Sequence, residues 1–187
     1  MSKVCPVWVG YVLASPLRRV FHNPYAILSP HVREGMTVLD AGCAMGFFSL
    51  PLARLVGPSG RVICVDLQKG MIRGLEQRAE RAGLIGRLEG RLCSPNDLGV
   101  DDLDGKVDFA LAFACVHEAP DSAGLLGQLA KSLKIGGRCL LAEPRGHVTT
   151  SAFEKTVALA EAQSLVATAR PEIIRCRAAQ LEKMPVQ

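Results

Sequence analysis

From residue 36 onward, short apolar runs alternate with longer stretches in which apolar residues recur every three or four positions. The short runs predict buried strands, and the longer stretches predict helices that pack on them. Strands that alternate with helices indicate a mostly parallel sheet covered on both faces. The predicted strands are residues 36–40, 61–66, 87–93, 107–113 and 138–143.

The apolar spacing also places two helices. In residues 69–82 an apolar face precedes Gly83, where the helix should end. In residues 122–133 a helix should begin at an Asp121 cap and stop at Gly136-Gly137. The predicted buried positions are Met71, Ile72, Leu75 and Ala79 in the first helix and Leu125, Leu126, Leu129 and Leu133 in the second.

The two ends of the chain differ from this alternation. Residues 151–163 predict a further helix, after which residues 165–169 and 175–183 have the pattern of two strands with no helix between them. Strands joined without a crossover pair antiparallel, so we expect a closing hairpin. Residues 1–30 precede the alternation and form an N-terminal extension.

Composition narrows the class of protein. The 187 residues suffice for one domain with its own apolar core. The 22 basic and 18 acidic residues give a net charge of only +4, and aromatic residues make up 5% without a basic stripe, so no nucleic-acid partner is expected. Seven cysteines without a Cys-x-x-Cys pair argue against a disulfide framework and against a zinc site, so no metal is expected.

The apolar run at residues 4–14 superficially resembles a signal peptide, but Pro6 interrupts it and no small-residue cleavage site follows. It is also shorter than the stretch of about 20 residues that spans a bilayer. The sequence therefore predicts a cytoplasmic protein. Docking of this segment on a membrane surface is an alternative.

The most informative motif joins the first two predicted strands. The first strand ends at Asp40 and turns through Gly42 and Gly46, and the second ends at Asp66. A strand–loop–helix–strand unit of this kind is typical of sites for nucleoside-containing cofactors. Glycine tolerates positive φ and lets the backbone approach a ligand. Because the third glycine of the dinucleotide fingerprint is absent, the motif favours a cofactor without a pyrophosphate.

Over about residues 30–183, the chain resembles the class I S-adenosylmethionine-dependent methyltransferases. The resemblance is carried by residues 38–46 (Val-Leu-Asp-Ala-Gly-Cys-Ala-Met-Gly), 62–66 (Val-Ile-Cys-Val-Asp), 108–113 (Asp-Phe-Ala-Leu-Ala-Phe) and 133–137 (Leu-Lys-Ile-Gly-Gly). It implies an α/β fold with a Rossmann-like seven-stranded sheet, ordered 3-2-1-4-5-7-6 with strand 7 antiparallel, and helices on both faces. Residues 31–187 would form the methyltransferase domain, and residues 1–30 a helical extension or lid.

The resemblance also implies a set of cofactor-binding residues for S-adenosyl-L-methionine and its product S-adenosyl-L-homocysteine. Asp40 would face the methionine amino group, directly or through water, Asp66 would accept hydrogen bonds from both ribose hydroxyls, and Leu67 would pack against adenine. The backbone at Gly42, Cys43, Ala44 and Gly46 would cradle the methionine and ribose, Cys93 and Ser94 would contact the adenine edge, and Ala114 would lie under the amino-acid portion. Ala44 stands where the family usually has glycine.

Methyl transfer is an in-line displacement, so the protein mainly aligns the acceptor and excludes water, with a general base needed only for a protonated acceptor. Candidate bases follow the fourth and fifth strands, as His117 with Glu118 and as Glu143 with His147. Their alternative role is a hydrogen-bonded network that holds the loops. Arg145 could bind an anionic substrate or be solvated.

The extension is expected to shape the acceptor pocket, through Trp8, Tyr11, His22, Asn23 and Tyr25. The sequence thus predicts a methyltransferase that acts on a small molecule, and membrane docking of the extension would suit a lipophilic acceptor such as a quinone precursor. An NAD(P)-dependent Rossmann oxidoreductase and a non-catalytic S-adenosylmethionine-binding protein are the alternatives. The acceptor, the methylated atom and the oligomeric state stay open.

Overall fold

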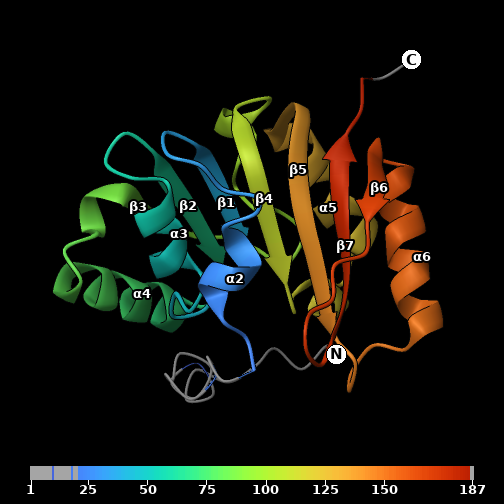
Figure 1. Ribbon diagram of the computed structural model, residues 1–187, viewed down its shortest axis with the longest axis horizontal. Helices are drawn as coiled ribbons and strands as arrows, with labels where there is room; N and C mark the ends of the chain where they lie inside the picture. The colour runs from blue at the N-terminus through green and yellow to red at the C-terminus, as the bar shows by residue number, and fades with distance from the viewer. Residues whose placement is uncertain (1–9, 11–17, 19–20, 186–187) are drawn as a thin grey trace.

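The computed structural model describes Gly10, Arg18 and residues 21–185 of the chain. These residues form a seven-stranded sheet in the order β3-β2-β1-β4-β5-β7-β6. Strand β7 runs antiparallel to both of its neighbours, and the other pairings are parallel (Figure 1). The predicted strand order and closing hairpin are therefore confirmed.

The strands closely follow the predicted apolar runs, with one exception. They are β1 (Thr37–Ala41), β2 (Arg61–Asp66), β3 (Leu88–Leu92), β4 (Val107–Phe113), β5 (Leu133–Pro144), β6 (Leu165–Ala169) and β7 (Cys176–Lys183). Strand β5 begins five positions earlier than predicted, because Leu133 pairs with Val107 before a register shift. The predicted helix over 122–133 consequently ends at Ser132, and its extension toward Gly136-Gly137 was wrong.

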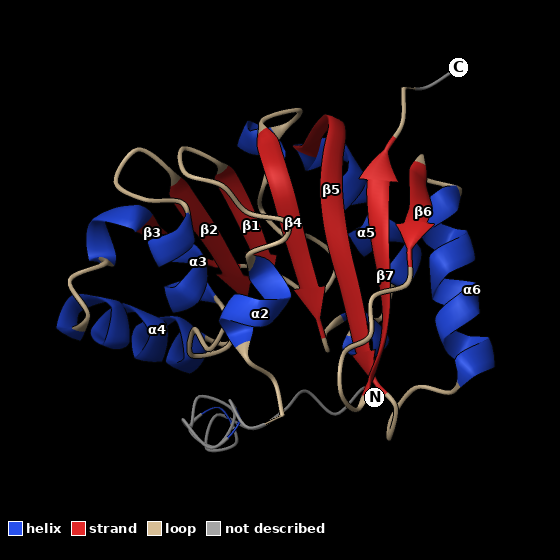
Figure 2. Ribbon diagram, viewed as in Figure 1, coloured by secondary structure: helices blue, strands red, loops and turns tan. Residues whose placement is uncertain are grey.

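Helices cover both faces of the sheet (Figure 2). They are α2 (Pro24–Leu28), α3 (Ser49–Leu55), α4 (Lys69–Arg81), α5 (Ser122–Ser132) and α6 (Thr150–Glu161), with 3₁₀ turns η2 (Ile85–Arg87), η3 (Asp101–Leu103) and η4 (Val116–Glu118). The predicted buried face of α4 is confirmed at all four positions. In α5 the predicted Asp121 cap accepts from the Gly124 N–H at 2.9 Å, whereas Leu125 is only half-buried.

The apolar core has two layers, one on each side of the sheet. Helices α2, α3 and α4 contribute Leu28, Leu52 and Leu75 to one layer, and α5 and α6 contribute Leu126 and Phe153 to the other. The central strands are buried on both faces, as a parallel sheet requires. Because Leu28 is fully buried, helix α2 at the end of the N-terminal extension is anchored in this core.

The parallel arrangement brings the carboxyl ends of β1, β2, β4 and β5 to one edge of the sheet (Figure 1). Ligands of open α/β sheets bind at this edge, near the point where the strand order reverses. Here the order reverses between β1 and β4. Among the described residues, no helix combines the length and apolarity needed to cross a membrane.

Candidate functional site

A cavity of about 740 Å³ opens at this edge. Both predicted acids, Asp40 and Asp66, line it, as do the predicted general-base candidates His117, Glu118 and His147. Among the other residues predicted to bind the cofactor, the cavity is lined by Gly42, Cys43, Ala44, Leu67, Cys93, Ser94 and Ala114. The fold therefore brings predicted residues from the ends of five strands, β1 to β5, into one cavity.

Gly46 is the predicted cofactor residue that does not line the cavity. Its φ is +79°, and a Cβ atom there would collide with the side chain of Leu75 on α4. The glycine thus permits close packing of the loop on the helix. Gly42 differs, because it borders the cavity with φ +72° and an added Cβ would lie 2.6 Å from the Cβ of Cys115.

Ala44, which stands at the usual glycine position, also adopts a left-handed conformation, with φ +46°. A residue with a Cβ is strained there by about 1–2 kcal/mol. The Ala44 N–H donates to Oδ2 of Asp66 at 2.9 Å, which holds the loop in this conformation. The local backbone therefore explains why glycine suits this position.

Asp66 joins the loop to the start of α4. Its Oδ1 accepts from the Gln68 N–H at 2.9 Å, while Oδ2 accepts from Ala44. Burial raises the pKa of Asp66, and the two backbone hydrogen bonds oppose that rise. Each carboxylate oxygen can accept a further hydrogen bond, so the side chain retains the capacity to bind a diol.

Asp40 is the most deeply buried acid of the cavity, with 3% of its surface exposed. The Ser49 hydroxyl donates to its Oδ2 at 2.5 Å. Burial raises the pKa of Asp40 to about 7, although the Ser49 hydrogen bond lowers it, and the nearby Asp66 charge raises it further. A cationic ligand group beside Asp40 would stabilise the ionised carboxylate.

The candidate bases are arranged differently from the prediction. Glu143 was paired with His147, but its Oε2 lies 2.5 Å from Nδ1 of His117, and its Oε1 accepts from the N–H groups of Val116 and His117 at 2.9 and 3.2 Å. Glu143 is buried and does not line the cavity. It is therefore the residue that orients His117 and fixes η4 at the end of β4.

His117 itself remains accessible from the cavity. Its hydrogen bond with Glu143 raises its pKa, while burial lowers it. Its Nε2 lies 4.0 Å from Oε1 of Glu118, and its ring is edge-on to that of His147 with centroids 5.6 Å apart. With Nδ1 engaged by a carboxylate, Nε2 is the nitrogen available to exchange a proton.

Part of the N-terminal extension reaches the cavity, though not through all the predicted residues. His22 lines it, but Asn23 instead caps α2 by accepting from the N–H groups of Tyr25 and Ala26, and Tyr25 does not line the cavity either. Trp8 and Tyr11 lie outside the described residues.

Sequence reasoning missed two arginines, Arg18 and Arg175, that line the same cavity. Arg18 lies in the N-terminal extension, and no spacing rule links it to residues far along the chain. Arg145, which was considered for substrate binding, donates from Nε to the Cys176 carbonyl at 3.0 Å and does not line the cavity.

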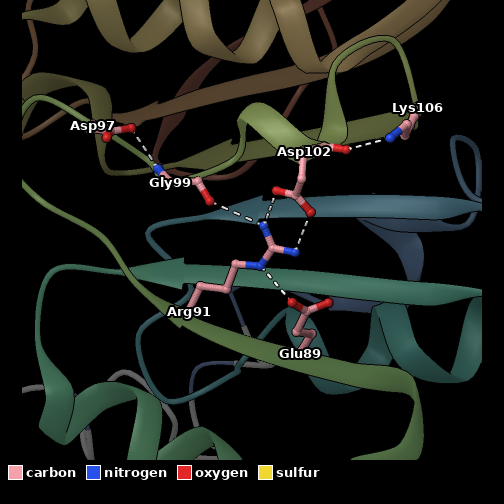
Figure 3. A network of polar contacts seen from close by, with 6 residues as sticks. All are labelled: Glu89, Arg91, Asp97, Gly99, Asp102 and Lys106. Atoms are coloured by element: carbon pink, nitrogen blue, oxygen red, sulfur yellow. Dashed lines mark hydrogen bonds and ion pairs between the residues drawn. The ribbon is translucent and has the colours of Figure 1, made fainter.

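The loop after β3 is anchored from the sheet edge (Figure 3). Arg91 on β3 donates to both carboxylate oxygens of Asp102 at 2.6 and 2.9 Å and to the Gly99 carbonyl at 3.2 Å. Asp97, the acid nearest the predicted adenine edge, accepts from the Gly99 N–H at 2.8 Å. Its carboxylate therefore shapes this loop, which also carries Ser94 to the cavity wall.

Comparisons with known proteins agree with this geometry. A family model described as a methyltransferase domain matches residues 32–181. The ubiquinone/menaquinone biosynthesis C-methyltransferase UbiE of Pasteurella multocida is 30% identical over 132 residues, which cover 71% of this chain and 48% of that protein. The chain spans no more than about half the length of the first curated relatives that it matches.

Solved structures share the fold. A S-adenosylmethionine-dependent methyltransferase from Aquifex aeolicus superposes with a TM-score of 0.87 at 21% identity, covering 97% of this chain and 100% of that chain. The geranyl diphosphate C-methyltransferase of Streptomyces coelicolor A3(2) gives a TM-score of 0.74 at 16% identity, covering 91% and 80%. At these identities the likeness establishes the architecture.

Proposed function

Because the chain belongs to the class I S-adenosylmethionine-dependent methyltransferases, we propose that it transfers a methyl group from S-adenosylmethionine to a small-molecule acceptor. The observation that carries the proposal is the presence of Asp40 and Asp66 in one cavity, on either side of the glycine loop. The family match removes the nicotinamide oxidoreductase alternative. A protein that binds the cofactor without turnover is separated by the experiment below.

The donor set of the cavity fits the cofactor. Asp66 would hold the ribose hydroxyls, since both of its oxygens have remaining acceptor capacity. Asp40 would hold the methionine ammonium, because a buried carboxyl with a raised pKa is stabilised in its ionised form by a cation. Leu67, which is 37% exposed at the cavity wall, offers an apolar surface for adenine.

The bound cofactor supplies an activated methyl group, and the protein's task is to orient the acceptor and exclude water. Phe47, Phe48 and Phe113 provide an apolar wall for this purpose. Where the acceptor carries a proton, His117 would take it at Nε2 while Glu143 stabilises the resulting imidazolium through Nδ1. Glu118 would adjust the charge around His117, and the ring of His147 would pack edge-on against it.

A small-molecule acceptor is supported by the size of the cavity. Its volume of about 740 Å³ falls in the range of about 300–1,000 Å³ found for sites of small ligands. Proteins similar to this chain are named for C-methylation in ubiquinone/menaquinone biosynthesis and for C-methylation of geranyl diphosphate, and neither name refers to a macromolecular acceptor. The apolar phenylalanine wall favours an acceptor with a substantial apolar portion.

Calorimetric titration with S-adenosylhomocysteine tests cofactor binding, and labelled methyl transfer into a metabolite extract tests turnover. Asp66→Ala should weaken the affinity about 100-fold, because hydrogen bonds to a charged group are worth about 1.5–3 kcal/mol each. Asp104→Ala, which removes an exposed carboxylate outside the cavity, is the matched control. No heat of binding to the folded wild type would reject the proposal, and binding without label transfer would assign a non-catalytic role.

A further inference from the structure

Charged side chains are segregated along the cavity. Asp66, Asp97 and Asp121 line the side formed by β2 and by the loops that follow β3 and precede α5. Arg18 and Arg175 line the side near the start of β7, since Arg18 interacts electrostatically with Cys176 and Arg175 directly precedes it. The cavity thus has an acidic end and a basic end, and Asp40 lies between them, because it interacts electrostatically with both Asp66 and Arg18. Arg175 does not contribute to the pKa shift of Asp40, so the second arginine of the basic end is not explained by the acids predicted to bind the cofactor.

The basic end is also aromatic. The Arg18 guanidinium carbon lies 4.5, 5.4 and 5.6 Å from the ring centroids of Phe47, Phe48 and Phe113. Four of the six phenylalanines of the chain line the cavity, the fourth being Phe21. A guanidinium stacked on rings presents its N–H donors in its own plane, the geometry that binds planar oxyanions in a bidentate manner.

Arg175 adds a second guanidinium beside Phe21, with 4.5 Å between its central carbon and the ring centroid. Its backbone has φ +60°, and its carbonyl accepts from the Arg145 N–H at 2.9 Å, which fixes the turn into β7. Nearby His22 adds no charge at neutral pH, because burial lowers its pKa and the two arginines lower it further against its hydrogen bond to Ile174. The positive charge at this end therefore comes from Arg18 and Arg175.

Resting on the proposed function, we propose that this basic, aromatic end binds the methyl acceptor as a flat aromatic compound that carries a carboxylate or another delocalised oxyanion. Arg18 and Arg175 bind the oxyanion, and the phenylalanine rings pack against the aromatic body. In the transfer, a lone pair of the acceptor forms the new bond to the methyl carbon, and the electrons of the broken carbon–sulfur bond remain on sulfur as a neutral thioether. No oxidant or further reactant is required.

The cofactor carries a carboxylate of the same chemistry, and Arg18 interacts electrostatically with Asp40, the residue assigned to the neighbouring ammonium. If Arg18 bound only the carboxylate of the cofactor, it would not contribute to binding of the acceptor. The affinities of S-adenosylhomocysteine and of 5′-methylthioadenosine, which lacks the amino-acid portion, show whether Arg18 binds the carboxylate of the cofactor or the oxyanion of the acceptor. Loss of affinity for the first ligand alone, on Arg18→Gln, would assign Arg18 to the cofactor and overturn the proposal for this residue.

The test is an NMR titration of benzoate, and of the neutral isostere benzamide, into protein saturated with S-adenosylhomocysteine. The wild type should bind benzoate at least about tenfold more tightly than benzamide. Arg18→Gln and Arg175→Gln should each abolish this preference without weakening S-adenosylhomocysteine. Arg61→Gln, which removes the same charge from the exposed amino end of β2, should retain it.

Equal binding of benzoate and benzamide to the wild type would overturn the proposal while leaving the proposed function intact. So would a preference for benzoate that survives in both arginine variants. If Arg18→Gln fails to fold, as judged by circular dichroism, Arg175→Gln carries the same comparison. If the wild type does not bind S-adenosylhomocysteine, the proposed function itself fails. The titration with S-adenosylhomocysteine, carried out before benzoate is added, detects this outcome.

Discussion

The backbone N–H of Ala44 donates to the carboxylate of Asp66 at 2.9 Å, which connects the loop after β1 directly to the end of β2. Twenty-two residues separate the two partners in the chain, yet each defines the other's conformation. The hydrogen bond satisfies a loop donor and holds Ala44 at φ +46°. The acid predicted to bind ribose is therefore also the residue that shapes the loop beside it.

This relationship predicts that Ala44→Gly stabilises the protein by up to about 1.5 kcal/mol. Relief of left-handed strain gains about 1–2 kcal/mol, and the greater flexibility of glycine in the unfolded chain offsets about 0.5–1 kcal/mol. Urea unfolding measures the change. Gly83→Ala is the matched control, because Gly83 has φ +65° with open space around it and should lose a similar amount. A destabilised Ala44→Gly protein would mean that the loop does not strain residue 44.

A second prediction concerns the pH dependence of cofactor affinity. Burial raises the pKa of Asp40 to about 7, so the carboxyl is largely protonated in the free protein below that pH. A ligand ammonium favours the ionised form, and binding must then release a proton. Affinity for S-adenosylhomocysteine should rise up to tenfold per unit between pH 5.5 and 7 and level off above.

The raised pKa of Asp40 has the opposite effect on the free energy of unfolding, which should fall as the pH rises. The folded state holds the Asp40 proton between pH 3.8 and about 7 while the unfolded state has lost it, so this group lowers the free energy of unfolding as pH rises through that window. Asp40→Asn should remove both pH dependences, as measured by calorimetry and by chemical denaturation. Because the pKa of His117 is also raised, from 6.5, this histidine adds a pH dependence of its own above pH 6.5. His117→Gln is therefore the control and should retain the Asp40 contribution. An Asp40→Asn protein with the wild-type affinity profile would contradict this assignment.

The interaction between His117 and Glu143 gives a third prediction. The hydrogen bond raises the pKa of His117 in the folded state, so its stabilisation is fully present below pH 6.5 and is lost as pH rises through the folded-state pKa. Glu143→Gln should cost about 2 kcal/mol at pH 6, because a buried charged acceptor of three hydrogen bonds is replaced by a neutral one. The difference from the wild type should shrink at higher pH. A pH-independent difference would show that His117 does not sense the Glu143 charge.

Much of the fold could be predicted from the sequence because apolar periodicity and turn residues are local signals. Strand β2 and the buried face of α4 follow from such patterns alone. The start of β5 did not, because Leu133 joins the sheet through its pairing with Val107, a partner distant in sequence. Strand pairing overrode the helical pattern at that position.

In the cavity, too, local sequence patterns predicted some residues, and contacts between distant segments decided the others. Asp40 and Asp66 could be found because each lies in the last two positions of an apolar strand, and parallel strand ends meet at one edge of the sheet. The pairing of Glu143 with His117 rather than with His147 depends on where η4 lies relative to β5, which no local pattern specifies. Arg18 and Arg175 are brought together only by the packing of the extension against β7. Long-range contacts therefore account for what the sequence did not predict.

The last prediction concerns Arg91, which anchors the loop after β3 from outside the cavity. The Asp102 side chain is 59% exposed, and ion pairs of such exposure contribute at most about 1 kcal/mol to stability. Arg91→Ala should therefore change the free energy of unfolding by less than about 1 kcal/mol. The loop would nevertheless lose the contacts to Asp102 and to the Gly99 carbonyl that fix it beside Ser94.

Hydrogen exchange should consequently become faster in residues 94–104 of Arg91→Ala, and affinity for S-adenosylhomocysteine should fall severalfold because the predicted adenine wall is less ordered. Affinity for methionine, which does not use that wall, should not change. Arg138→Ala is the matched control, since Arg138 forms an exposed ion pair with Glu182 away from the cavity. If exchange in the loop accelerates without any loss of cofactor affinity, the region around Cys93 and Ser94 does not contact adenine, and the nucleoside must be held by β1 and β2 alone.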